Sequence, residues 1–204
     1  VICQDIKSIY YPKNSTEVQD VVRKAISLGN RVRVSGKMHS ASTQLCTSGI
    51  SLSTKKLNRI IGLEQFNGEQ TVHVEAGVSI GELASWLHGK NYSLGYTMIG
   101  YRGVSVAGST ATGSHGSSPK HDAVMASLIR SLTIVNSNGQ LVEISQKNTR
   151  PEEWRAFRTS LGMLGVIVSM RLKVRPQFNL EVTVNSHKRK DLFKDGGVKK
   201  LVEN

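Results

Sequence analysis

The hydrophobic positions at the start of the chain predict one helix and two short strands. Five apolar residues recur at the spacing of one helix face: Val18, Val21, Val22, Ala25 and Ile26. Ser15 or Thr16 is expected to cap this helix, and Gly29-Asn30 is expected to end it. The apolar stretches 32–34 and 50–52 are short enough to be strands. The chain is therefore expected to open with helix and strand in alternation.

Period-two alternation predicts that most of the remaining elements are strands. Strands are expected over, or directly after, residues 57–61, 71–76, 132–135, 140–144, 166–174 and 178–184. Asn67-Gly68 is a turn signal, and residues 136–139 predict a hairpin between the two strands that flank them. Helices are expected over residues 80–87 and 152–161.

Residues 95–118 form a stretch rich in Gly and Ser that carries almost no charge. Such a run is most often a flexible loop. Here Val104, Val106, Ala107 and Ala111 interrupt the hydroxyl residues, which indicates a packed segment. Small residues and uncharged backbone would let a planar or anionic ligand lie against the main chain.

Composition indicates an ordinary globular chain. Of its 204 residues 38% are hydrophobic but only 5% are aromatic, so the core must consist mainly of Val, Ile and Leu. This hydrophobic content argues against disorder. The length suits one domain, or two small subdomains that share a core.

The formal net charge of +12 raises the question of a nucleic-acid partner. The Lys and Arg residues are spread along the chain, except for the group at 187–190, and no aromatic residues lie among that group to stack on bases. We therefore expect no nucleic-acid partner. An anionic ligand such as a dinucleotide fits the charge, and so does a further part of the protein that carries compensating acid.

Two cysteines and two sequons bear on the compartment. Cys3 and Cys46 are not in metal-binding or CxxC spacing, so no metal site is expected, and whether the two pair is left open. Asn14-Ser15-Thr16 and Asn91-Tyr92-Ser93 are N-glycosylation sequons. The chain starts at Val1, and the sequence holds no signal peptide or apolar span. Together these features favour a processed glycoprotein, secreted or in the endomembrane lumen, with no membrane span.

The segment 33–40 is the strongest local candidate for a binding loop. A short strand runs into Gly36 and then into the pair His39-Ser40. Successive backbone N–H groups in such a turn can form a nest for phosphate. The imidazole of His39 is a nucleophile at the end of the same turn.

Three ordered motifs make the chain resemble a known family. The first is Gly36-Lys37-Met38-His39-Ser40, the second runs from Ser105 to Gly116, and the third is 161–167. They resemble the FAD-binding (PCMH-type) domain of the vanillyl-alcohol-oxidase family of flavoproteins, and above all the aldonolactone and alditol oxidases. The likeness covers residues 8–182.

The resemblance implies an α+β fold of two α/β subdomains. A small N-terminal sheet with helices would span residues 1–65, and a larger, mainly antiparallel sheet with helices would span 66–182. Residues 183–204 would then begin a substrate-binding domain that is either truncated or carried by a separate chain.

The resemblance also implies which residues bind FAD. The expected cofactor-binding residues come from the three motifs: Val34, Ser35, Gly36, Lys37, Met38, His39, Ser40, Gly100, Ser105, Gly108, Thr112, Gly113, Ser114 and Ile167. His39 stands where the family commonly bonds its flavin covalently. His115 is expected to be a hydrogen-bonded structural residue. Residues 95–118 contain no cysteine, so a second covalent link through Cys is not expected.

Two departures from the family pattern concern the loop and oxygen. Lys37 and Met38 stand where the family usually has Gly or Ser. A positive φ at either would cost on the order of 1 kcal/mol; Lys37 could offset this cost by facing the pyrophosphate, or a remodelled loop could displace His39. Ile99 stands where a small residue admits O2 to the flavin, and either Ile99 hinders O2 or Gly100 supplies the opening.

The function implied is that of an FAD-dependent oxidoreductase. It would oxidise a CH–OH group of a sugar-like or secondary-metabolite substrate by hydride transfer to flavin N5, with O2 as the expected acceptor. The catalytic residues are unknown and expected in a C-terminal half, because family members are about twice as long. The chain would be a truncated piece, one product of a split gene, or a nicked chain. The alternatives are a flavin enzyme of secondary metabolism with poor O2 use, and a non-redox binding module of degenerate flavin fold.

Overall fold

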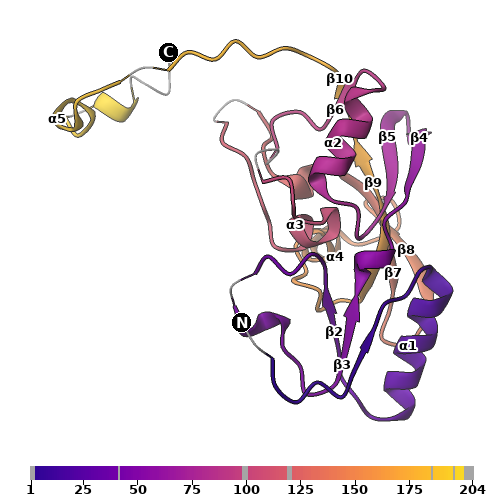
Figure 1. The fold of residues 1–204 in the computed structure, drawn as a ribbon. Coiled ribbons are helices and arrows are strands. Elements are labelled where there is room, and N and C mark those ends of the chain that lie inside the picture. The colour runs from indigo at the N-terminus through magenta and orange to yellow at the C-terminus, as the bar shows by residue number, and fades with distance from the viewer. Residues whose placement is uncertain are drawn as a thin grey trace.

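A computed structural model of the protein describes residues 3–40, 42–97, 101–118, 121–184, 186–194 and 196–199 (Figure 1). It contains a small parallel sheet and a larger antiparallel sheet, with helices on both. The predicted mixed fold of one small and one large sheet is thereby confirmed. The division of the chain near residue 65, and the start of a new domain at residue 183, stay predictions.

The small sheet has the strand order β1-β3-β2, and all its pairs are parallel. Its strands are β1 (Ser8–Tyr10), β2 (Val32–Ser35) and β3 (Ile50–Ser53), and helix α1 (Ser15–Ser27) joins β1 to β2. The cap of α1 is Asn14, one residue earlier than predicted, because its Oδ1 accepts the N–H of Glu17 at 2.9 Å. Gly29, at φ +60°, ends the helix as expected.

The large sheet has the order β4-β5-β9-β7-β8 and is antiparallel throughout. Its strands are β4 (Ile60–Phe66), β5 (Glu69–Glu75), β7 (Ile129–Val135), β8 (Leu141–Ser145) and β9 (Val166–Lys173). As the sequence predicted, the turn at Asn67-Gly68 closes the hairpin of β4 and β5, and the turn at 136–139 closes that of β7 and β8. Its main core cluster lies beneath α2 (Ile80–His88), α3 (Val106–Ala111) and α4 (Pro151–Arg158).

Helix α1 joins the two sheets into one packed unit. Its buried face consists of Val18, Val21, Val22 and Ala25. These side chains share one hydrophobic cluster with the small sheet and with three residues of the large sheet: Val135, Val166 and Val168. The two sheets therefore share a core, as the chain length allowed.

Two helices differ from the sequence-based expectation. Helix α4 ends at Arg158 and does not reach residue 161, because Leu161 and Gly162 both have positive φ (51° and 72°). The Gly- and Ser-rich stretch contains a true helix, α3. It begins after Ser105, whose side chain accepts the N–H of Gly108.

The strand predicted at residues 178–184 is wrong. Strand β10 (Arg175–Pro176), which pairs with β6 (Tyr92–Ser93), is the last strand of the described residues. Beyond it the chain leads away from the body to the four-residue helix α5 (Arg189–Leu192) (Figure 1). Leu180, Val182 and Val184 alternate as a strand would, but their side chains are exposed. Alternation becomes a strand only where a neighbouring strand supplies hydrogen bonds, and none of the described residues does so here.

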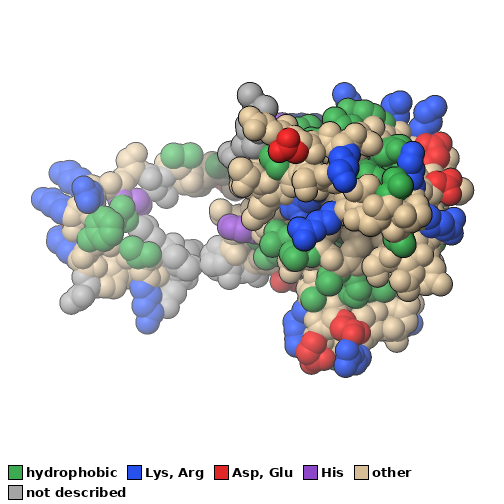
Figure 2. Space-filling view, turned by 90° about the horizontal axis from the view of Figure 1, so that it is seen from below, with side chains coloured by type: hydrophobic (Ala, Val, Ile, Leu, Met, Phe, Trp, Pro, Cys, Tyr) green, Lys and Arg blue, Asp and Glu red, His purple; other side chains and the backbone are tan. Residues whose placement is uncertain are grey.

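The basic residues are spread over the surface. On the face shown in Figure 2, Lys and Arg side chains are scattered over the body, and a separate group lies around α5. No helix in the described part of the chain is long and apolar enough to cross a membrane.

The segment 75–80 connects the two sheets to the second glycine-rich motif. The N–H of Gly77 donates to the carbonyl of Leu57 at 2.7 Å, and that of Ala76 donates to Val168 at 2.9 Å. Val78 and Ala76 in turn accept from Val106 and Ala107, at the start of α3. Every one of these bonds is between backbone groups, so their geometry depends on how closely the chains approach.

We expect Gly77→Ala to destabilise the protein by about 1–3 kcal/mol, because a Cβ there would overlap the carbonyl oxygen of Thr54 and lie 2.8 Å from that of Leu57. Urea unfolding measures the change. The control is Gly89→Ala, since a Cβ at Gly89 meets nothing closer than 3.6 Å; we expect it to be neutral or to stabilise by up to about 1 kcal/mol. Equal effects of the two substitutions would refute the close-approach account.

Candidate functional site

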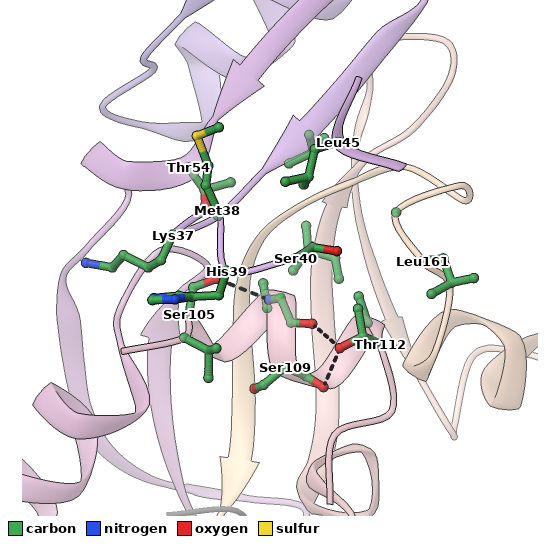
Figure 3. Close-up of a pocket in the computed structure, with 18 of the residues that line it drawn as sticks. Lys37, Met38, His39, Ser40, Leu45, Thr54, Ser105, Ser109, Thr112 and Leu161 are labelled. Carbon is green, nitrogen blue, oxygen red and sulfur yellow. Dashed lines mark hydrogen bonds between the residues drawn. The ribbon is translucent and has the colours of Figure 1, made fainter. Parts of the chain in front are cut away.

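A cavity of about 450 Å³ lies between the loop that follows β2 and the helix α3 (Figure 3). Lys37 and His39 lie at one end of the cavity and Leu161 at the other, with Thr112, directly after α3, between them. The first and second glycine-rich motifs, far apart in the sequence, thus face each other across one space.

Most of the predicted binding residues line this cavity. They are Val34, Gly36, Lys37, Met38, His39, Ser40, Ser105, Gly108, Thr112, Ser114 and Ile167. Ser35 does not, because it is a buried residue of β2 whose carbonyl accepts from Thr54. Gly113 does not either; its φ of +68° serves the turn after α3. Gly100 and Ile99 lie outside the described residues.

Other lining residues were not among the predicted cofactor-binding residues. They are Arg33, Gln44, Leu45, Thr54, Tyr101, Val104, Ala107, Ser109, Ala111, Leu161, Gly162 and Gly165. Many of them fall within or beside the second and third motifs, at residues 101–111 and 161–165. Taking each whole motif and its neighbours as the binding segment would have found them. Gln44, Leu45 and Thr54 come from short 3-10 segments that no periodicity marks.

Gly36 lets the two motifs approach. A Cβ at this position would overlap the hydroxyl of Ser105, the residue that caps α3. A larger residue would therefore separate the loop from the helix and widen the cavity.

The loop after β2 places a non-glycine residue in a left-handed backbone conformation, which costs free energy. Met38 has φ +60°, a left-handed conformation that costs a non-glycine residue roughly 1 kcal/mol, as anticipated. Lys37 does not lie free: its Nζ is 3.9 Å from Oε2 of Glu82. Hydrogen bonds from the Ser79 hydroxyl and backbone N–H lower the pKa of Glu82, and Lys37 adds to this effect, so the carboxylate stays ionised beside the loop.

The backbone of the loop offers unused donors. Within the described part of the chain, the N–H groups of residues 37–40 donate to no protein acceptor. Successive free N–H groups of this kind form an anion-binding nest.

His39 is held at the end of the loop by an aromatic neighbour. Its Nδ1 is 3.0 Å from the hydroxyl of Tyr101, and the two rings meet edge to face with centroids 5.2 Å apart. Gly103 allows this position, since a Cβ there would lie 3.0 Å from Nε2 of His39. His39 and Tyr101 both line the cavity, so the imidazole borders any ligand bound there.

The charges on the cavity wall are of one sign. Arg33 and Lys37 line it, and no Asp or Glu is among its described lining residues. Such a wall favours an anion. No group of described residues is arranged to hold a metal ion.

His115 lies outside the cavity wall. Its Nδ1 is 2.8 Å from the carbonyl oxygen of Gly116, and its backbone bridges to Val124. This is the hydrogen-bonded structural role that the sequence suggested.

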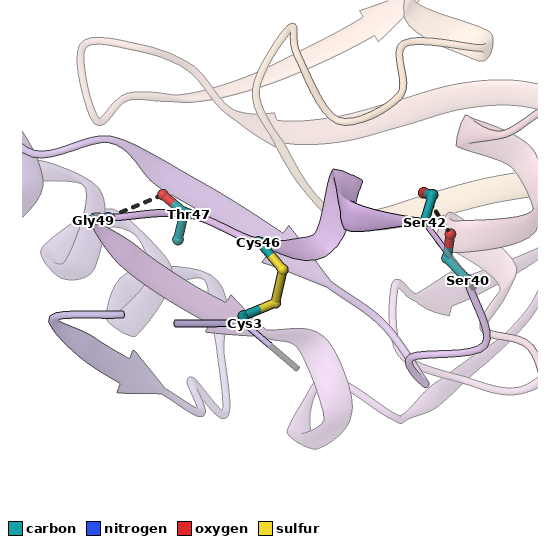
Figure 4. The surroundings of a disulfide bond; sticks show 6 residues. All are labelled: Cys3, Ser40, Ser42, Cys46, Thr47 and Gly49. Atoms are coloured by element: carbon teal, nitrogen blue, oxygen red, sulfur yellow. Dashed lines mark hydrogen bonds between the residues drawn. A yellow bond between two sulfur atoms is a disulfide. The ribbon is translucent and has the colours of Figure 1, made fainter. Parts of the chain in front are cut away.

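A disulfide borders the site. Cys3 and Cys46, whose pairing the sequence left open, are bonded (Figure 4). Cys46 directly follows the 3-10 helix Thr43–Leu45, and two residues of that helix line the cavity. The disulfide therefore ties the N-terminal segment to one wall of the cavity.

Comparison with known proteins points to one family. Residues 6–145 match the family described as FAD binding domain. D-arabinono-1,4-lactone oxidase of Kluyveromyces lactis is 35% identical over 178 residues, which cover 86% of this chain and 33% of the relative. L-gulonolactone oxidase of Bos taurus is 31% identical over 175 residues, covering 85% of this chain and 38% of the relative. The chain thus spans about a third of the length of the curated relatives it matches.

A solved structure shares the fold. The crystal structure of 6-hydroxy-D-nicotine oxidase from Arthrobacter nicotinovorans superposes with a TM-score of 0.71 at 20% identity. The match covers 82% of this chain and 36% of that chain.

Replacing both Cys3 and Cys46 by serine is expected to lower the free energy of unfolding by about 2–4 kcal/mol, since the bond spans 43 residues and restricts the unfolded chain. Urea unfolding with and without dithiothreitol measures this. The reductant should shift the midpoint of the unmodified chain and leave the double variant unchanged. An unchanged midpoint in both would mean that the bond contributes no stability.

Proposed function

This chain belongs to the FAD binding domain family, and on that premise we propose that its cavity holds FAD and that the protein is a flavin-dependent oxidoreductase. The observation that carries the proposal is the wall of the cavity. It combines free N–H groups at residues 37–40 with the cations Arg33 and Lys37, and it holds no carboxylate among its described residues.

The residues present fit FAD in charge and shape. The two phosphate charges of FAD match the loop N–H groups, and hydrogen bonds to charged groups are the stronger kind. The Nε of Arg33 is buried and has no hydrogen-bond partner in the part of the chain that the structure describes, which also suits an anion. The cavity-facing side of α3 includes residues with a small side chain or none: Ala107, Gly108 and Ala111. A ligand can therefore approach the main chain of this helix.

His39 is the proposed covalent anchor of the flavin. It lies exposed in the cavity wall, which supports the proposal. The hydrogen bond to Tyr101 fixes the direction in which the imidazole faces. A bond between His39 and the cofactor would prevent loss of FAD from the site.

Oxidation of a CH–OH group in a sugar-like substrate is the proposed reaction. When bound, FAD supplies a ring that accepts a hydride at N5. The support is that D-arabinono-1,4-lactone oxidase and L-gulonolactone oxidase are similar in sequence, and their names favour O2 as the acceptor. The groups that hold the substrate and take its proton are proposed to lie in a further part of the protein, on the same chain or a separate one.

An oxidising compartment is proposed for the protein. The Cys3–Cys46 disulfide supports it, because such bonds persist mainly in secreted and luminal proteins. N-glycosylation is proposed as well, because the sequons at Asn14 and Asn91 are both exposed.

Acid precipitation of the full-length protein tests the cofactor and its link together. We expect a yellow pellet from the unmodified protein and a colourless pellet with yellow supernatant from His39→Ala, because only the imidazole would bond the flavin. His115→Ala is the control, since His115 lies outside the cavity wall, and it should keep its flavin in the pellet. A colourless pellet from the unmodified protein would refute the covalent link, and a protein without flavin absorption would refute the FAD site.

Turnover of aldonolactones tests the reaction. The flavin-loaded full-length protein is expected to consume O2 and release H2O2 in equal amounts with a five- or six-carbon lactone. Flavin reduction without O2 uptake would show a dehydrogenase, and no reduction by any lactone would refute this substrate class.

A further inference from the structure

Arg33 lies where the cavity meets a second hollow. It is a part-buried residue in the middle of β2, three positions before Gly36. The second hollow, of about 570 Å³, shares Arg33, Gln44 and Leu161 with the cavity. Leu161 marks the end of the cavity opposite His39 (Figure 3). Arg33 therefore borders the far end of any ligand whose ring lies beside His39.

Among the described residues, the guanidinium of Arg33 has no partner that balances its charge. Its Nε is buried and makes no hydrogen bond, and among the described residues no carboxylate pairs with it. Neither hollow has an Asp or Glu among its described lining residues. Leaving such a donor unmet in the folded protein is costly.

Several arginines of the chain pair with carboxylates, and among the described residues only Arg33 and Arg158 have a buried side-chain nitrogen or oxygen without a hydrogen-bond partner. Arg158 donates through Nη1 to the carbonyl of Ala126 and does not line the cavity. Arg59 pairs with Glu75 at 2.7 Å, and Arg171 pairs with Glu64 and Glu143 at 2.6 and 2.7 Å. Lys37, the other cation of the cavity wall, lies near Glu82. Of the two cations in the cavity wall, Arg33 is therefore the one whose positive charge no described carboxylate balances. A bound anion would balance it.

We propose that Arg33 pairs with a phosphate oxygen of the cofactor and makes the cavity select an anionic dinucleotide over an uncharged flavin. The inference rests on the proposed FAD site and adds the residue that reads the charge of the ligand. Loop N–H groups can bind any anion, whereas the planar guanidinium of Arg33 matches a phosphate group, which riboflavin lacks.

Binding constants for FAD and riboflavin test this in the full-length protein. His39→Ala serves as the background, so that flavin exchange is reversible, and quenching of flavin fluorescence gives each Kd. Adding Arg33→Gln should raise the Kd for FAD about tenfold or more and leave that for riboflavin within about twofold. ADP should likewise lose its ability to compete with FAD, while adenosine should compete as before.

Two variants serve as controls. Arg31→Gln removes the same charge from an exposed residue that borders only the second hollow, and both Kd values should stay within about twofold. Arg33→Lys keeps the charge and should bind FAD more tightly than Arg33→Gln. Without ligand, Arg33→Gln should melt no lower than the background, because it removes an unmet donor.

The outcomes separate the two proposals. If the background protein does not bind FAD, the proposed FAD site is wrong. If it binds FAD but Arg33→Gln changes nothing, or changes FAD and riboflavin equally, only the role of Arg33 is wrong. Should Arg33→Gln fail to fold, competition of ADP and of adenosine with FAD is measured in Arg33→Lys. Weaker competition by ADP with unchanged competition by adenosine supports phosphate pairing. Equal changes for the two competitors overturn it.

Discussion

The close approach of Gly77 to the carbonyl groups of Thr54 and Leu57 is the constraint on which the site depends. It holds segment 75–80 against residues 54–57, which directly follow β3 of the small sheet, and the same segment receives the first residues of α3 and bonds to β9. The cavity has one wall from the loop after β2 and another from α3. Its width is therefore set by two close approaches that leave no room for a Cβ: Gly77 lies against backbone carbonyl groups, and Gly36 lies against the side chain of Ser105.

The walls held in this way carry groups that the described residues do not satisfy. The buried Nε of Arg33 and the left-handed Met38 each raise the free energy of the folded state, and the N–H groups of 37–40 are donors that make no bond to the described residues. An anion that binds the folded chain alone would stabilise it by mass action. Cofactor binding and stability are thus expected to be coupled in this protein, with the Cys3–Cys46 bond supporting the same wall from outside.

Periodicity predicted the regular elements well, because α1 and the strands of the large sheet bury one face each. It failed where structure depends on distant partners. Residues 178–184 have the pattern of a strand but no neighbouring strand among the described residues. Helix α3 consists of small residues, and its first turn is bonded to the distant residues Ala76 and Val78. For the site, the motifs indicated the loop and α3. They could not indicate Tyr101 beside His39 or the uncompensated Arg33, since both depend on which side chains meet after folding.

The central claim is that the cavity between the loop 36–40 and α3 is the seat of FAD. A crystal structure of the flavin-loaded full-length protein tests it most directly. The account predicts pyrophosphate oxygens within hydrogen-bond distance of the N–H groups of residues 37–40, and the flavin ring at the His39 end. Density for FAD elsewhere, or a pyrophosphate away from this loop, would contradict it.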